Sequence, residues 1–187
     1  MTARDEAIGD EEISADDIDF AGRRSQQTLV AIHEHLREEL DRLGDMVDQL
    51  RAGSLDPGAA RSHIAQMTMR QNAWTVGAYC ASYCRLLTLH HTIEDERMFV
   101  DLRAGEPSLG PVIDRLAADH VSISGVMDEV DRTLVGLVES SGSRGGQRAG
   151  IDAVEEAVGR LGEQLLRHLD EEEAALLGAI GRLSLAL

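Results

Sequence analysis

Two pairs of histidine and glutamate recur at the same spacing in this chain. Glu94 follows His90 by four residues, and Glu172 follows His168 by four residues. Residues four apart on an α-helix lie one turn apart on the same face, so each pair presents an imidazole and a carboxylate in the same direction. These two groups together suit iron, manganese and zinc. The spacing therefore predicts a metal site to which both pairs contribute.

Two single histidines extend this set. His33 shares a helix face with Leu29 and Leu36, and His120 shares one with the apolar residues before and after it. An imidazole on an apolar face is costly unless it finds a partner. The predicted metal ligands are His33, His90, Glu94, His120, His168 and Glu172. Such a set is generous for one ion and favours a dinuclear centre with a bridging carboxylate.

The remaining candidates occupy other positions on the helices. His91 lies one step round from His90 and can reach the edge of the site. His35 falls among charged residues and should face water, and His63 has no companion and is expected at the surface. Tyr83 lies two turns before His90 on the same face, where it could donate a hydrogen bond to a ligand or act as a redox residue. Packing in the core is the alternative for Tyr83.

The elements that must position these residues are amphipathic helices. Apolar residues recur at spacings of three and four, beginning with a stripe that predicts a helix over about 23–52. Further helices are expected over about 59–102 with a bend or break near 70–72, over about 110–139, and over about 151–183, with a flexible loop over 140–150. Four long helices predict an all-α fold, an up-down-up-down four-helix bundle spanning residues 23–187.

Composition narrows the class of protein. The 187 residues include 34 acidic and 18 basic ones, a formal net charge of −16, and every basic residue is arginine. This balance argues against binding to nucleic acid or to an anionic membrane surface. The acidic N-terminal residues 1–22 have little to bury, and we expect a disordered tail there. The chain has neither an apolar span nor a signal-peptide pattern, so we expect a cytoplasmic protein.

The motifs around the candidate ligands resemble those of hemerythrin-like, or HHE cation-binding, domains. They are HEHLREEL at His33, HHTIEDERMF at His90, LAADH at His120 and HLDEEEAAL at His168. The resemblance covers about residues 25–183, and YCASYCRLLTLHHTIEDERMF is especially similar to actinobacterial members. It implies a four-helix bundle around a non-heme centre of two iron ions, bridged by an oxo or hydroxo group and by carboxylate. The family binds or reduces dioxygen.

The chain departs from the oxygen carriers of this family at one position and is ambiguous at another. Ser124 stands where the carriers place a second histidine on the third helix, so one imidazole is missing or is replaced by water or by His91. The acid of the fourth helix lies five residues after the histidine in the carriers, which is Glu173, and four after it in other HHE domains, which is Glu172. Its helix face favours Glu172, with Glu173 as the second choice.

The leading functional hypothesis is a non-heme di-iron protein that binds, reduces or senses dioxygen, peroxide or nitric oxide, served by a redox partner. The alternatives are an oxidase, peroxidase or oxygenase of an organic substrate, which requires a pocket beside the site, and an iron-sensing or iron-buffering interaction protein. A structural zinc site is a further alternative, but zinc is usually satisfied by four ligands.

Overall fold

The computed structural model describes residues 15–53, 62–140 and 144–185, with side chains described over 20–53, 76–140 and 145–185. All regular secondary structure in this part of the chain is helical. Its elements are α1 (Ala15–Ala52), α2 (Ser62–Ile93), a π-helical turn (Glu94–Met98), α3 (Phe99–Gly105), a 3₁₀ turn (Pro107–Leu109), α4 (Gly110–Ser140) and α5 (Arg144–Leu183). None of the described helices has an apolar stretch long enough to cross a membrane.

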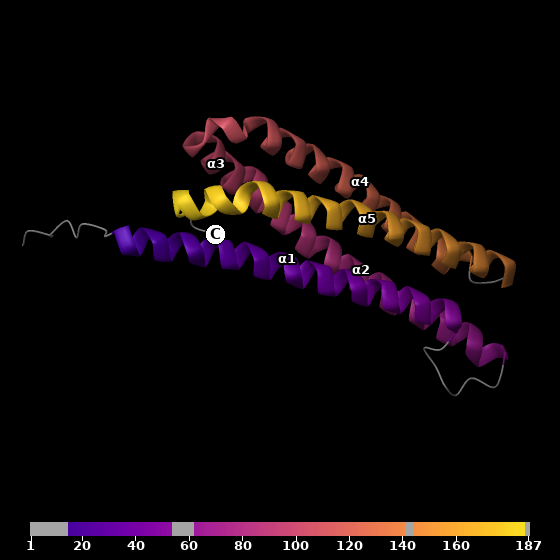
Figure 1. Ribbon diagram of the computed structural model, residues 1–187. Helices are drawn as coiled ribbons and strands as arrows, with labels where there is room; N and C mark the ends of the chain where they lie inside the picture. The colour runs from indigo at the N-terminus through magenta and orange to yellow at the C-terminus, as the bar shows by residue number, and fades with distance from the viewer. Residues whose placement is uncertain (1–14, 54–61, 141–143, 186–187) are drawn as a thin grey trace, which may run out of the picture.

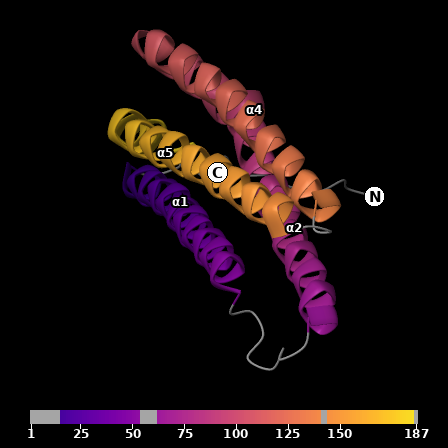
Figure 2. The same cartoon turned by 90° about the vertical axis from the view of Figure 1, so that its right-hand side faces the viewer.

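The long helices form the predicted up-down-up-down four-helix bundle. Helix α2, the π turn and α3 run on as one arm, so the bundle consists of α1, this arm, α4 and α5 (Figure 1). Helix α5 packs against both α1 and α4, and α2 packs against the same two helices from the other side. Figure 2 shows α5 lying between α1 and α4. The all-α fold class predicted from the helix pattern is therefore confirmed.

Several helix boundaries differ from those expected. Helix α1 begins at Ala15, so part of the segment expected to be a disordered tail is helical, and residues 1–14 lie outside the described residues. Helix α2 is continuous through 70–72, where a break was expected, and the irregular turn lies at Glu94–Met98 instead. Helix α5 begins at Arg144 rather than at 151, which shortens the expected loop.

Close packing between helices explains the early start of α5. Glycine is unfavourable inside a helix by about 1 kcal/mol, and the glycine-rich composition of this segment predicts a loop. A Cβ at Gly150, however, would lie 2.9 Å from Leu137 Cδ1. Glycine thus lets the first turns of α5 lie against α4, and tertiary contact outweighs local propensity. The end of α1 follows propensity, because Gly53 adopts a left-handed φ of 64° directly after the helix.

The apolar core is divided in two by a polar layer. One half is centred on residues such as Leu43, Val130 and Leu161, and the other on residues such as Leu102, Leu116 and Ile180. Between them lie seven buried polar side chains: His33, His90, His91, Glu94, His120, His168 and Glu172. Buried polar groups are costly unless they are paired, so this layer is the feature of the fold that requires a chemical explanation.

Candidate metal centre

The helical period brings the polar layer together from all four arms of the bundle. His33 projects from α1, His90 and His91 from the end of α2, His120 from the middle of α4, and His168 with Glu172 from α5. Each of these side chains is at most 7% exposed. The six residues predicted as ligands therefore lie together at the centre of the bundle, and His91 lies with them.

These side chains form two groups that share one carboxylate. The first group is His91, Glu94, His120 and His168, and the second is His33, His90, Glu94 and Glu172. Within each group, one nitrogen or oxygen atom of every residue lies within 4.8 Å of the corresponding atoms of the others. Each group therefore has the donor types and the spacing to hold a metal ion.

The two oxygens of Glu94 point to different groups. Its Oε1 lies 3.1 Å from His90 Nε2, and its Oε2 lies 3.4 Å from His120 Nε2. Glu172 has a related position, because its Oε2 lies 3.5 Å from His33 Nε2 and 3.7 Å from His168 Nε2. Glu94 thus faces imidazoles of both groups through its two oxygens, and Glu172 faces His33 and His168 through one.

Among the described residues, His120 Nε2 and His168 Nε2 lie within hydrogen-bond distance of each other, at 3.1 Å, but most other polar atoms at the centre lack a partner. Both oxygens of Glu94, both oxygens of Glu172 and the Nε2 atoms of His33, His90 and His91 are buried without one. Native proteins rarely leave buried polar atoms unpaired, and an ion is one established reason for such a group. Unpaired carboxylate oxygens and imidazole nitrogens facing one another are a donor set for cations, so the residues present fit a metal.

Carboxylates on the far side of the imidazoles orient two of them. His33 Nδ1–H donates to Glu173 Oε1 at 2.8 Å, and Arg37 Nη1 donates to the same oxygen at 2.8 Å. His120 Nδ1–H donates to Asp95 Oδ1 at 3.0 Å. A proton held on Nδ1 leaves the lone pair of Nε2 for the centre, as metal-binding histidines require.

His168 shows a looser form of this arrangement. Its Nδ1 lies 3.8 Å from Asp119 Oδ2, which is ion-pair distance rather than hydrogen-bond distance. Asp119 directly precedes His120 in α4, so this helix supplies one imidazole of the centre and the carboxylate beside another.

Burial keeps the imidazoles in the neutral form that binds metals. Desolvation, reinforced by the neighbouring histidines, lowers the pKa of His90 to about 3, of His91 to about 2 and of His120 to about 3. Desolvation also lowers the pKa of His33, and it lowers that of His168 to about 4. At neutral pH these nitrogens need no deprotonation before they bind a cation.

The two carboxylates respond to burial in the opposite direction. Desolvation raises the pKa of Glu172 to about 8, and it raises the pKa of Glu94 well above its ordinary value with a further contribution from Glu172. Without a cation, the folded protein therefore binds protons at these groups. A divalent ion would displace those protons and offset the burial of both charges.

A π-helical turn changes which residues of the arm formed by α2 and α3 face the bundle interior beside the centre. Phe99 N–H donates to Glu94 O, an i→i+5 bond that takes up one extra residue. Met98 and Phe99 are consequently both buried although they are adjacent, and Phe99 stacks on His120 with ring centroids 5.4 Å apart. The turn lets Glu94 reach the polar layer while Met98 and Phe99 pack into the apolar core.

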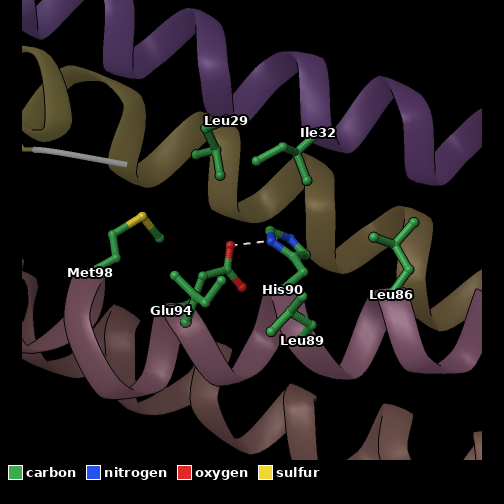
Figure 3. A pocket seen from close by; sticks show the side chains of 8 residues that line it. Leu29, Ile32, Leu86, Leu89, His90, Glu94 and Met98 are labelled. Atoms are coloured by element: carbon green, nitrogen blue, oxygen red, sulfur yellow. Dashed lines mark ion pairs between the residues drawn. The ribbon is translucent and has the colours of Figure 1, made fainter.

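Two pockets reach the centre from different sides. One, of about 270 Å³, is lined by His91, His120, Asp95 and Ser124 together with other residues of α2 and α4. The other, of about 210 Å³, lies between α1 and α2 and is lined by apolar side chains, His90 and Glu94 (Figure 3). One group of donors is therefore reached through a polar pocket and the other through an apolar one.

The structure places the remaining candidates from the sequence as follows. Glu173 is outside both groups and orients His33, whereas Glu172 lies within one. Tyr83 donates its hydroxyl proton to the main-chain oxygen of Leu36 at 3.2 Å, so its hydrogen bond serves packing between α1 and α2. His35 is exposed, as expected. The side chain of His63 lies outside the described side chains.

Asp95, Asp119 and the orienting role of Glu173 were not foreseen from the sequence. Each is adjacent to a predicted ligand or to its motif, and acids next to a ligand are the signal that could have indicated them. Their partners lie on other helices, however, so spacing along the chain does not reveal the pairing.

Comparison with known proteins identifies the family of the chain. The model of the hemerythrin HHE cation binding domain matches residues 25–180, which is most of the chain. Neither a curated protein nor a solved structure matches this chain. The matched range contains every residue of the two donor groups.

Proposed function

The chain belongs to the hemerythrin HHE cation-binding domain family, and from this premise we propose that it is a non-heme di-iron protein that binds, reduces or senses dioxygen, peroxide or nitric oxide. The observation that carries the proposal is the position of Glu94 between two groups of imidazoles. A single carboxylate shared by two sets of buried donors supports two ions rather than one.

The donors divide in a way that suits iron. His91, His120 and His168 would hold one ion, and His33, His90 and Glu172 would hold the other, with Glu94 between them. Mixed imidazole and carboxylate donors suit iron, whereas structural zinc sites are usually rich in thiolates. Iron bound there would supply electrons and an open coordination position for a small ligand. A redox partner would return those electrons.

Residues of the chain supply the rest of the proposed chemistry. Glu173 and Asp95 hold protons on His33 and His120, which keeps the Nε2 atoms directed at the centre. The polar pocket beside His91 and His120 admits water and small polar ligands, and Ser124 at its wall is exposed. The two halves of the apolar core exclude water above and below the polar layer.

Metal analysis of the aerobically purified protein tests the proposal. We expect two irons per chain and near-ultraviolet charge-transfer absorption. Glu94→Gln should lose both ions together because Glu94 belongs to both groups, whereas the matched control Glu96→Gln, in the same turn and exposed, should retain both. One zinc per chain without iron would contradict the proposal, and so would loss of only one ion from Glu94→Gln.

The entry of a small ligand is tested at Ser124. Ser124→His would place an imidazole at the wall of the polar pocket, one turn beyond His120. We expect this variant to hold iron at least as tightly, to bind azide more weakly and to react more slowly with peroxide. Equal azide affinity and equal peroxide rates would show that ligands do not approach through this pocket.

A second candidate function is favoured by the apolar pocket. An oxidase or oxygenase of an organic substrate requires a site for that substrate beside the centre. The pocket between α1 and α2 provides space lined by His90 and Glu94 on one side and by apolar residues on the other. Turnover of an organic molecule with consumption of dioxygen would distinguish this function from ligand binding or sensing.

A further inference from the structure

The apolar pocket between α1 and α2 has a composition unlike that of the polar layer it adjoins. Its apolar lining consists of Leu29, Ile32, Leu86, Leu89, Ile93 and Met98. Figure 3 shows Leu29 and Ile32 extending from α1 toward Leu86, Leu89, His90 and Glu94 on the arm below. His90 and Glu94 are 7% and 2% exposed, so they form the inner wall of the pocket.

We propose that this pocket binds a small, neutral, apolar organic molecule, about the size of one aromatic ring with a short alkyl chain, and holds it against His90 and Glu94. This inference deepens the proposed function, and it rests on that function only in placing the bound molecule beside a metal centre. Binding itself depends on the pocket, which is formed by residues of the chain.

The volume selects the size of the ligand. An apolar cavity of about 150 Å³ in another protein holds benzene. The pocket here has a volume of about 210 Å³, which leaves room for a ring and an alkyl substituent. A diatomic molecule such as dioxygen would fill only a small part of it. Each additional methylene that is buried should tighten binding about fourfold until the space is filled.

The lining selects a neutral ligand. Apart from His90 and Glu94, every residue that lines the pocket within the described part of the chain is apolar. The Oε1 atom of Glu94 already lies 3.1 Å from His90 Nε2, and both groups face the centre. A charged ligand would give up its hydration to a mostly apolar lining, and an anion would in addition face the carboxylate of Glu94, which is strongly unfavourable.

The mouth of the pocket gathers exposed apolar surface. Leu89 is 57% exposed, Ile93 46% and Ile32 37%. Exposed apolar side chains that gather at one place mark binding sites more often than the same residues scattered singly. A small molecule is the occupant to which we commit, because the pocket leads inward to the buried donors.

Binding of a series of alkylbenzenes to the full chain tests the proposal. Benzene, toluene, ethylbenzene and propylbenzene are titrated into the metal-free and the iron-loaded protein, and binding is followed by the methyl NMR signals of leucine, isoleucine and methionine. We expect one molecule per chain, affinity rising about fourfold per methylene, and no binding of benzoate. In the iron-loaded protein, the bound molecule should also shift the near-ultraviolet absorption.

Two tryptophan variants provide the structural control. Leu89→Trp should fill the mouth of the pocket and weaken binding at least tenfold while the metal content and the thermal midpoint remain unchanged, since Leu89 is largely exposed. Leu166→Trp, on α5 and 38% exposed, should bind as the unmodified protein does. Equal loss in both variants would overturn the assignment to this pocket.

The remaining outcomes are distinct. Binding of xenon but of no alkylbenzene would overturn the proposal and leave a pocket that admits only small gas molecules or atoms. Self-association that Leu89→Trp abolishes, without binding of alkylbenzenes, would overturn it in favour of an interface with a second copy of this chain. Alkylbenzene binding by a protein that takes up no iron would support the pocket and contradict the proposed function, so the two failures are distinguishable.

Discussion

Replacing Glu172 with glutamine should stabilise the metal-free protein although it removes a proposed metal ligand. Glu172 is fully buried, and neither of its oxygens has a hydrogen-bond partner among the described residues. Desolvation raises its pKa from 4.5 to about 8, so the folded protein must bind a proton there at neutral pH while the unfolded chain does not. Glutamine has nearly the same shape and is neutral at every pH.

The size of the effect follows from the difference in pKa. At pH 7 the unfolded glutamate is about 2.5 pH units above its pKa of 4.5, and each unit corresponds to about 1.4 kcal/mol. Glu172→Gln should therefore raise the free energy of unfolding of the metal-free protein by about 3 kcal/mol at pH 7. In a domain of this size that amounts to roughly 6–12 °C in the thermal midpoint.

The pH dependence identifies the cause. Because the folded-state pKa lies above the unfolded value, the stability that Glu172 contributes is complete below about pH 4.5 and is lost as the pH rises to about 8. The difference between variant and unmodified protein should thus vanish near pH 4 and grow through neutral pH. With iron bound the order should reverse, since the cation offsets the buried charge and the variant loses a donor.

The assay is chemical unfolding of both proteins in a chelator at pH 4.5, 6, 7 and 8, repeated after loading with iron. Glu163→Gln, an exposed position on the same helix, is the control and should change the free energy of unfolding by no more than about 0.5 kcal/mol. A variant no more stable than the unmodified protein at pH 8, or equally stabilised at pH 4.5, would refute the desolvation argument.

Three further predictions concern the ligands, their orientation and the helix contacts. His168→Ala should remove most of the metal and His35→Ala none, as measured by metal analysis, because His168 is buried in a donor group and His35 is exposed. Glu173→Gln should weaken iron binding by about tenfold or more in chelator competition, because the anion that orients His33 is lost. Asp170 pairs with Arg37 but not with His33, so Asp170→Asn should leave iron binding unchanged. Gly22→Ala should lower the free energy of unfolding by about 1–3 kcal/mol, since its Cβ would collide with main-chain atoms of α5, whereas Gly44→Ala, with nothing nearby, should not destabilise the protein.

The sequence by itself determined the fold class and the residues that face inward. Helical periodicity is local, so spacings of three and four place His33, His90, His120 and His168 on the apolar faces without knowledge of their neighbours. Every one of them is buried in the structure. The motifs around them also indicated the family, which the match over residues 25–180 confirms.

Only the tertiary structure decided which of these residues belong to each donor group and which ones orient a ligand. Glu172 and Glu173 are adjacent on α5, and their helix face favours the first but does not say what the second contacts; the packing of α1 beside α5 places Glu173 against His33 and Arg37. His91 joins the group of His120 because α4 lies beside the end of α2, where the two rings stack with centroids 4.0 Å apart.

The helix boundaries and the pockets were beyond the sequence for the same reason. The glycines at the start of α5 have low helix propensity, yet contact with α4 holds that segment helical. The π turn at Glu94–Met98 lets Glu94 enter the polar layer while Met98 and Phe99 enter the apolar core, and only the packed bundle sets these demands. The apolar pocket exists because side chains of α1 and α2, far apart in the chain, leave space between them. Local periodicity specifies which face of each helix is buried, and the packing of the helices specifies which atoms meet there.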